Sequence, residues 1–193
     1  QVIASGVDTS LCSPAAKDWG LYASVGRFVE KKAHDDTLRA FAQVAERFPE
    51  ARLSLIGDGP LLDDTRRLCA ELNLAERVTF HGALPHQEVC AIVSRAGYYL
   101  QSSKTAADGD EEGFPSAIQE ALAAGCVVAC TTHAGASHFL DHRTTALLNC
   151  EGDYRAMAEN LLDLGEVSGL RETISQNARR LAVESFDQMI SIK

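Results

Sequence analysis

The sequence is short of positive charge. Its 18 lysine and arginine residues stand against 27 aspartate and glutamate residues, which gives a formal net charge of −9. Proteins that bind nucleic acid without sequence preference are usually basic, so we expect no nucleic-acid partner. A ligand that carries phosphate would have to be held by a few local basic groups.

Long apolar runs are also missing. No stretch approaches the roughly 18 residues that span a bilayer, and no secretory leader is recognisable at the start of the chain. We therefore expect a cytoplasmic protein. The hydrophobic fraction of 46% is ordinary for a globular domain.

The cysteine pattern contains no C-x-x-C pair. The six cysteines are Cys12, Cys69, Cys90, Cys126, Cys130 and Cys150. For a chain of this size without a secretion signal, we expect reduced and mostly buried thiols. Cys126 and Cys130 flank an apolar run, so we expect them on one face of a strand as small core residues.

Several catalytic motifs are absent as well. There is no G-x-x-x-x-G-K-[ST] loop, which excludes a P-loop nucleotidase. A Ser-His-Asp triad drawn from Ser102, His133 and Asp108 lacks a nucleophile elbow, so we reject it. His138 and His142 have the i, i+4 spacing of a metal pair, but no carboxylate or third histidine is aligned with them. We therefore expect no metal.

Apolar strands alternate with amphipathic helices along the chain. The expected strands cover residues 21–25, 53–56, 78–80, 97–100, 126–130 and 146–148. Helices are expected near residues 38–48, 61–72, 85–93, 154–164 and 170–184, with another after Pro115. This alternation predicts right-handed βαβ units, and hence one doubly wound, Rossmann-like α/β domain with a parallel sheet. In such sheets ligands bind outside the carboxyl ends of the strands.

One stretch crowds acidic residues in front of a predicted helix. DGDEEGFPSAIQEALAAG, residues 108–125, places four acids before a Gly-Phe-Pro turn. Acids complement the positive end of a helix, but the crowding and the further carboxylate of Glu120 indicate a ligand. The spacing of Glu112 and Glu120 is weak support by itself, because Glu151 and Glu159 are also eight residues apart. We assign that second pair no role.

Three more stretches combine with this one. They are VGRFVEKK at residues 25–32, IGDGPL at 56–61 and VTFHGAL at 78–84. In this order and at these separations, they resemble the donor-binding domain of GT-B glycosyltransferases, specifically the retaining family 4 enzymes, and EEGFPSAIQEALAAG resembles that family's E-x7-E motif. The resemblance implies an interdomain linker at residues 1–20 and one nucleotide-sugar-binding, Rossmann-like GT-B half-domain at 21–193. The N-terminal acceptor domain would be absent from this chain.

The resemblance implies three catalytic residues, Arg27, Lys32 and Glu112. Arg27 and Lys32 match the two basic residues that hold the donor diphosphate, where cations stabilise the charge of the leaving group. An isolated Arg-x4-Lys pair is usually a surface feature, and its position directly after a strand favours the binding interpretation. Glu112 matches the acid that contacts the sugar, and Glu120 matches the acid that contacts the ribose. Eight helical residues between them would rise about 12 Å, which suits the two ends of a folded nucleotide-sugar.

The other residues implied to contact the nucleotide lie in turns. They are Gly26, Gly57, Asp58, Gly82, Gly113, Phe114 and Pro115. The amides around Gly113 would meet an anion at a helix N-terminus, with Pro115 at the first helical position. For Gly57 and Asp58, a plain strand-to-helix connection is an equally good interpretation. The loop acids Asp108, Asp110 and Glu111 would be solvated charges.

The chain departs from the family at two places. Ala33 stands where a glycine is common, and Ala134, Gly135, Ser137 and His138 stand where the family has two glycines and a Pro-Glu pair. These departures leave open a non-catalytic nucleotide-sugar-binding module. A GT-B epimerase that acts on the donor itself is a further alternative.

The resemblance implies a hexosyltransferase that moves a sugar from a nucleoside diphosphate donor to a saccharide or lipid-linked acceptor and retains the anomeric configuration. It implies no metal and no cofactor besides the donor substrate. The acidic DGDEEGFP form resembles bacterial enzymes of polysaccharide biosynthesis, whose full-length form could associate peripherally with the inner face of the membrane. Because the acceptor half is missing from this chain, we expect it to bind donor weakly and to transfer nothing.

Overall fold

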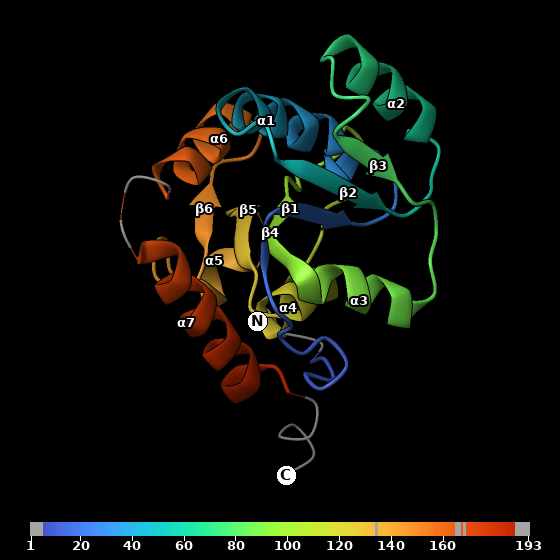
Figure 1. Ribbon diagram of the computed structural model, residues 1–193. Helices are drawn as coiled ribbons and strands as arrows, with labels where there is room; N and C mark the ends of the chain where they lie inside the picture. Colours follow the sequence, from blue (N-terminus) through green and yellow to red (C-terminus); the bar gives the residue numbers. More distant parts are fainter. Residues whose placement is uncertain (1–5, 134, 165–166, 168, 188–193) are drawn as a thin grey trace.

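The structure is a computed structural model that describes residues 6–133, 135–164, 167 and 169–187. Within these residues, six strands form one parallel sheet in the order β3-β2-β1-β4-β5-β6 (Figure 1). The strands are β1 (Asp18–Val25), β2 (Arg52–Ile56), β3 (Val78–Phe80), β4 (Ala96–Gln101), β5 (Val127–Thr131) and β6 (Leu147–Asn149). The strand order reverses between β1 and β4, which is the point where doubly wound sheets bind ligands.

Helices cover both faces of the sheet (Figure 1). One face carries α1 (His34–Arg47), α2 (Leu62–Glu71) and α6 (Tyr154–Asp163). The other carries α3 (His86–Arg95), α4 (Ser116–Ala123) and α7 (Leu170–Ser185). Two short helices, η1 (Glu30–Lys32) and α5 (Ala136–Phe139), lie in the loops after β1 and β5. The predicted α/β class and parallel sheet are thus confirmed; the two short helices were not predicted.

None of the described helices combines the length and the apolar character that a membrane crossing requires. The sheet is buried on both faces, which is why its strands appear in the sequence as continuous apolar runs. All residues of β4 and β5 are buried. In α1, Leu38 and Phe41 are 0% exposed, and Pro49 follows the end of the helix. Cys126 and Cys130 are fully buried core residues, also as predicted.

β1 begins at Asp18, which lies inside the segment predicted as linker and ahead of the predicted strand 21–25. Its first residues are only partly buried, so hydrophobic alternation does not mark them. Asp18 fixes them instead. Its Oδ1 accepts a hydrogen bond from Gly20 N at 3.0 Å, and its Oδ2 pairs with Arg52 Nη2 at 2.8 Å.

Cys12 and Cys90 form a disulfide, so the prediction of reduced thiols is wrong for these two residues. Of the other cysteines, Cys69, Cys126 and Cys130 are free and buried, whereas Cys150 is free and exposed. The disulfide joins positions 78 residues apart, which no local spacing reveals. Together with a hydrogen bond from Val7 N to Phe186 O at 2.8 Å, it fastens the segment before β1 to α3 and to the end of α7.

Candidate functional site

Three turns are joined by backbone hydrogen bonds at the carboxyl ends of β1, β2 and β3. Gly26 N donates to Ile56 O at 2.9 Å, and Gly57 N donates to Gly82 O at 2.8 Å. Phe28 N donates to the carbonyl of Asp58 at 3.0 Å. The predicted nucleotide-binding positions Gly26, Gly57, Asp58 and Gly82 therefore lie together at this edge of the sheet.

Glycine is required at position 57 by contacts within the protein, independently of any ligand. Gly57 has a φ of +137°, and a Cβ there would lie 2.0 Å from the carbonyl oxygen of Gly26. Gly59 is similarly confined, because a Cβ would lie 2.7 Å from Phe28 O. Close approach of two loops explains both glycines. At Gly82 and Gly113 an added Cβ would meet nothing within 4 Å.

Ala33 adopts the left-handed conformation that its family counterpart, a glycine, favours. Its φ and ψ are 44° and 48°, and it closes η1 directly before α1. A non-glycine residue in this region loses about 1–2 kcal/mol to the clash between its Cβ and the backbone. The loop thus keeps the turn that a glycine would make, at the expense of stability.

Lys32 and Glu112 form an ion pair at this edge. Lys32 Nζ lies 2.6 Å from Glu112 Oε1, and each side chain is only 12% exposed. Lys32 belongs to η1 after β1, whereas Glu112 lies in the loop between β4 and α4. Two of the predicted catalytic residues are therefore brought together from segments far apart in the sequence, in a partly dehydrated place where Coulomb attraction is stronger than in water.

A series of hydrogen bonds between side chains holds the carboxylate of Glu112 in place. Ser103 Oγ donates to Glu112 Oε2 at 2.8 Å, and Gln101 Nε2 donates to Ser103 Oγ at 2.9 Å. Tyr99 OH donates to Gln101 Oε1 at 3.1 Å and accepts from Val25 N at 3.3 Å. Tyr99, Gln101 and Ser103 alternate along β4 and beyond its end, so their side chains share one face. The sequence analysis did not show that these residues are linked.

His133 holds the backbone of Glu112. Its Nε2 accepts from Glu112 N at 3.3 Å, and its Nδ1 contacts Glu151 Oε1. Partial desolvation raises the pKa of Glu151, but the hydrogen bonds from His133 and from Thr105 outweigh it, so the net pKa lies below the ordinary value. We had assigned Glu151 no role from the sequence. Glu151 orients His133, and none of the described hydrogen bonds joins either residue to Ser102, whose hydroxyl accepts from Thr37 Oγ1 and donates to Met157 Sδ.

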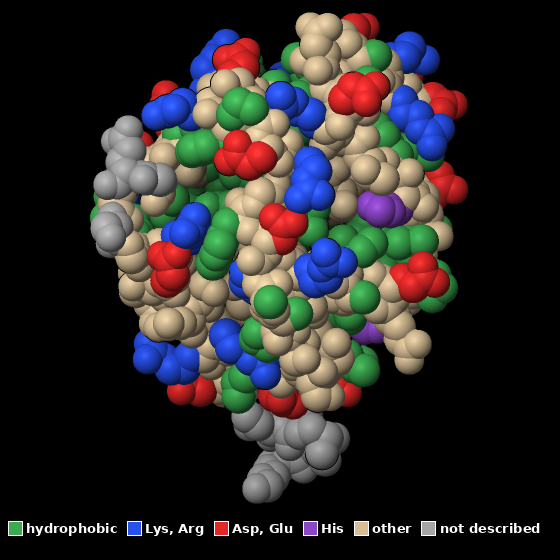
Figure 2. Space-filling model, in the orientation of Figure 1, with side chains coloured by type: hydrophobic (Ala, Val, Ile, Leu, Met, Phe, Trp, Pro, Cys, Tyr) green, Lys and Arg blue, Asp and Glu red, His purple; other side chains and the backbone are tan. Residues whose placement is uncertain are grey.

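The positive charge of the site comes from one short segment. Lys31 Nζ pairs with Asp110 at 2.9 Å, so Asp110 is not merely a solvated loop charge as predicted. The hydrogen bond to Asp110 raises the pKa of Lys31 above its ordinary value. Arg27 itself is exposed. On the face seen in Figure 2, basic and acidic side chains are interspersed.

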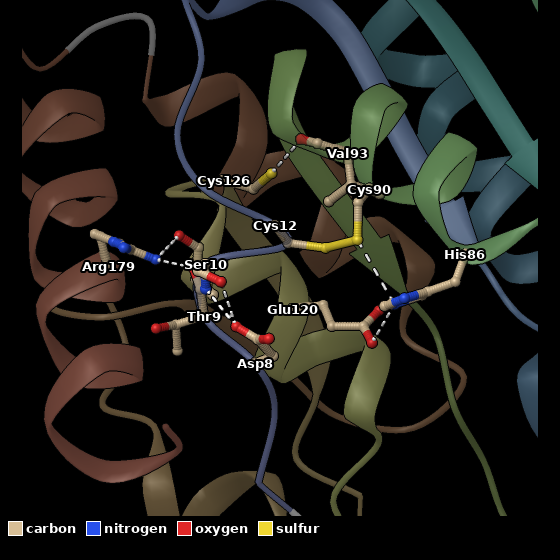
Figure 3. The surroundings of a disulfide bond; sticks show 11 residues. Asp8, Thr9, Ser10, Cys12, His86, Cys90, Val93, Glu120, Cys126 and Arg179 are labelled. Atoms are coloured by element: carbon tan, nitrogen blue, oxygen red, sulfur yellow. Dashed lines mark hydrogen bonds and ion pairs between the residues drawn. A yellow bond between two sulfur atoms is a disulfide. The ribbon is translucent and has the colours of Figure 1, made fainter. Parts of the chain in front are cut away.

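Glu120 lies on α4 and pairs with a residue that the sequence analysis did not single out. Its Oε1 is 3.0 Å from His86 Nε2 at the start of α3, and the two side chains point toward one another (Figure 3). Burial raises the pKa of Tyr99, and the charges of Glu120 and then Glu112 raise it further. No described hydrogen bond or ion pair joins Glu120 to Arg27 or to the Lys32–Glu112 pair.

The start of α4 differs in detail from the prediction. Pro115 is the N-cap, with φ −60° and ψ 134°, and the first helical residue is Ser116. Glu112 therefore precedes the helix, and a helical rise does not set its distance from Glu120. The ring of Phe114 is 6% exposed and packs against Phe139 at 4.9 Å between ring centroids, so only its backbone is left for a ligand.

His138 and His142 do not share a helix, because α5 ends at Phe139. His142 Nδ1 instead accepts from Leu148 N at 3.0 Å. The predicted departure at Ala134 lies outside the described residues. Its neighbour Gly135 is the N-cap of α5, where it adopts a φ of −90° and a ψ of −9°.

Comparison with known proteins gives a family and close relatives. The family model of glycosyl transferases group 1 matches residues 13–181. The chain is 33% identical to the putative colanic acid biosynthesis glycosyltransferase WcaL of Escherichia coli (strain K12), over 86% of this chain and 41% of that protein. It is 31% identical to the amylovoran biosynthesis glycosyltransferase AmsK of Erwinia amylovora, over 88% and 42%. The chain thus spans about two fifths of the length of these curated relatives.

Solved structures with the same fold include the C-terminal domain of a glycosyl transferase group 1 family protein (LpcC) from Francisella tularensis. That structure has a TM-score of 0.83 and 20% identity, and covers 95% of this chain and 100% of its own. Anabaena Alr3699/HepE in complex with UDP-glucose has a TM-score of 0.85 and 22% identity, over 100% of this chain and 54% of that one. At these identities the likeness concerns the fold alone.

Proposed function

Because the chain belongs to the family of glycosyl transferases group 1, we propose that it is the nucleotide-sugar-binding domain of a retaining glycosyltransferase. The full-length enzyme would transfer a hexosyl unit from a nucleoside diphosphate donor to a saccharide or lipid-linked acceptor. One observation carries the proposal: Lys32 and Glu112 are paired at 2.6 Å at the carboxyl edge of the sheet, where open α/β sheets bind ligands.

The donor diphosphate would be held by Arg27 and Lys32, with Lys31 close by. Negative charge grows on the diphosphate as its bond to the sugar breaks, so nearby cations stabilise the transition state more than the ground state. Lys32 carries three N–H donors, and its ion pair with Glu112 uses one of them. A phosphate oxygen can therefore bind Lys32 without displacing Glu112.

The sugar hydroxyls would be held by Glu112. A carboxylate accepts up to about four hydrogen bonds, so Ser103 and Lys32 leave lone pairs for the sugar. Because Ser103 holds the side chain and His133 holds the backbone amide, little conformational freedom is lost when the donor binds.

The ribose would be held by Glu120, whose carboxylate His86 orients. α4 begins at Ser116, four residues after Glu112, and the free N–H groups of a helix N-terminus suit an anion. Gly113 has open space around it, so a ligand can approach its backbone closely.

The relatives support a polysaccharide as the product. Two are named for the biosynthesis of colanic acid and of amylovoran, and one structural neighbour holds UDP-glucose. We infer that the acceptor contacts and the second wall of the active site come from another part of the full-length enzyme. The chain alone would then bind donor weakly and show no turnover. A cytoplasmic location and contact with the inner face of the membrane stay predictions.

Titration calorimetry of the chain with UDP-, GDP- and ADP-sugars tests the proposal. The variants are Arg27→Ala, Lys32→Met, Glu112→Gln and Glu120→Gln. Each removes one charge-assisted hydrogen bond worth about 1.5–3 kcal/mol, so donor affinity should fall about tenfold to a hundredfold. Matched controls are Arg67→Ala and Glu159→Gln, which change exposed residues of α2 and α6 and should leave affinity unchanged.

Donor binding that survives Lys32→Met and Glu112→Gln unchanged would refute the proposed site. Binding of no donor at all would refute the proposed function. Conversion of the free donor to an epimer without any acceptor would favour the epimerase instead.

A further inference from the structure

Two further side chains that can bind metal, those of His86 and Glu120, lie beside the Cys12–Cys90 disulfide (Figure 3). The ligand atoms of Cys12, His86 and Cys90 lie within 4.8 Å of one another. His86 Nε2 is 3.6 Å from Cys90 Sγ and 3.0 Å from Glu120 Oε1. A disulfide needs no imidazole beside it, so it does not account for the arrangement of His86 and Glu120.

We propose that reduction of this disulfide creates a zinc site in which Cys12, Cys90 and His86 are ligands and Glu120 is the fourth. Thiolate, imidazole and carboxylate are the groups that bind zinc, and four tetrahedral ligands are typical of structural sites. A dithiol reductant opens the disulfide by exchange: it gives up two electrons and becomes a disulfide itself, while each cysteine takes up a proton. Zinc then displaces both thiol protons, since only thiolates bind it.

The Cys90–His86 and His86–Glu120 distances suit this coordination, whereas the Glu120 carboxylate lies outside the group of ligand atoms within 4.8 Å of one another and must move toward the sulfurs. With Zn–S near 2.3 Å and Zn–N near 2.0–2.1 Å, a tetrahedron places a sulfur and a nitrogen ligand about 3.6 Å apart. Cys90 Sγ and His86 Nε2 already have this separation. Nitrogen and oxygen ligands need about 3.3 Å, which is a small change from the 3.0 Å between His86 and Glu120. The two sulfurs must move to about 3.8 Å apart, which becomes possible once their bond is broken.

Solvent reaches the cluster from one side. A groove of about 180 Å³ leads to it, lined by Leu11, His86, Gln87, Cys90, Ala91 and Ser94. The side chain of His86 is 53% exposed, whereas Cys12 and Cys90 are 1% and 4% exposed. A reductant and a metal ion can therefore enter beside His86, and bound zinc would be shielded on the cysteine side.

Zinc would also affect the donor, and this step rests on the proposed function. Glu120 is the proposed ribose ligand, and a carboxylate bound to zinc has fewer lone pairs for hydroxyl groups. Zinc would then weaken donor binding in the reduced protein only.

Cobalt spectroscopy tests the site without any donor. The chain is reduced with a phosphine, because a dithiol would itself compete for the metal. It is then titrated with Co2+ in the absence of donor, and Zn2+ is added to the cobalt-loaded chain. We expect one Co2+ per chain, the visible bands of tetrahedral coordination and a near-ultraviolet band from thiolate to cobalt. Zn2+ should remove all of them, and the oxidised chain should show none.

Variants identify the ligands. Cys12→Ser and Cys90→Ser should lose the thiolate band, and Cys150→Ser, at an exposed free cysteine, should keep it. His86→Ala leaves the disulfide intact as a check on folding, and should lose the tetrahedral bands after reduction. A reduced wild-type spectrum equal to that of Cys12→Ser, or one that His86→Ala does not change, would overturn the site.

Donor titrations of reduced protein, with zinc and with a chelator, test the link to Glu120. We expect affinity about tenfold lower with zinc, and Glu120→Gln should abolish the difference while keeping the thiolate band. Equal affinities alongside a positive cobalt spectrum would remove Glu120 from the ligand set. A chain that binds no donor would refute the proposed function and leave the cobalt result standing.

Discussion

Acidification from pH 7 to pH 5 is expected to destabilise the fold through the buried histidine His34. This residue is 4% exposed, and its ring stacks on Phe28 with 4.3 Å between ring centroids. Among the described residues, neither ring nitrogen has a hydrogen-bond partner. Burial lowers the pKa of His34 to about 4 from an ordinary value of 6.5, and the nearby backbone of Gly26 offsets only part of this effect.

The direction follows from where the protons bind. Between pH 6.5 and pH 4 the unfolded chain protonates this histidine and the folded chain does not, so stability is complete above pH 6.5 and falls as the pH drops toward 4. With these two pKa values, the loss between pH 7 and pH 5 is about 2 kcal/mol. A charged His34 would also stand at the positive end of α1, which acts in the same direction.

Urea unfolding at pH 7 and pH 5 measures this loss. Acidification should lower the free energy of unfolding of the wild type by about 2 kcal/mol more than that of His34→Gln, whatever the stability of each at pH 7. His138→Gln, which removes an exposed histidine, should behave like the wild type. An equal loss in the wild type and in His34→Gln would refute the reasoning, as would a His34 ring that titrates near pH 6.5 by NMR in the folded protein.

Three further substitutions, two of them with a matched control, test the packing of the fold. Ala33→Gly should raise the free energy of unfolding by about 1 kcal/mol in urea, because it relieves the left-handed conformation, whereas Ala70→Gly on exposed α2 should lower it by about as much. Lys17→Met should lower the melting temperature by the equivalent of about 3 kcal/mol, because its ammonium donates at 2.9 Å to two carbonyl oxygens at the end of α3; an unchanged melt would contradict this. Gly57→Ala should prevent stable folding, since its Cβ would lie 2.0 Å from a backbone oxygen, and Gly113→Ala, with open space around it, should be nearly neutral by circular dichroism.

Much of the fold was predictable because it depends on local patterns. The strands are buried on both faces, so each one appears as an apolar run between turn residues. The start of β1 and the two short helices were not predicted. The start of β1 is held by the Asp18–Arg52 pair, and η1 and α5 are too short to show a hydrophobic period. Neither leaves a hydrophobic signal in the sequence.

The candidate site was predictable in part. The order of the motifs indicated that Lys32 and Glu112 belong to one site, and the fold places them in contact. The hydrogen bonds that link Tyr99, Gln101 and Ser103 were not predicted, because they depend on side chains that meet only after folding. The roles of these residues toward a donor stay predictions.

The sequence by itself determined the alternation of strands and helices, the parallel sheet and the edge at which polar turns gather, because hydrophobic period and turn chemistry act between near neighbours. Only the tertiary structure decided which distant side chains meet: Lys32 with Glu112, His86 with Glu120, and Cys12 with Cys90. The physical reason is that a contact between distant residues depends on the path of the whole backbone, and that path is fixed by the packing of the core.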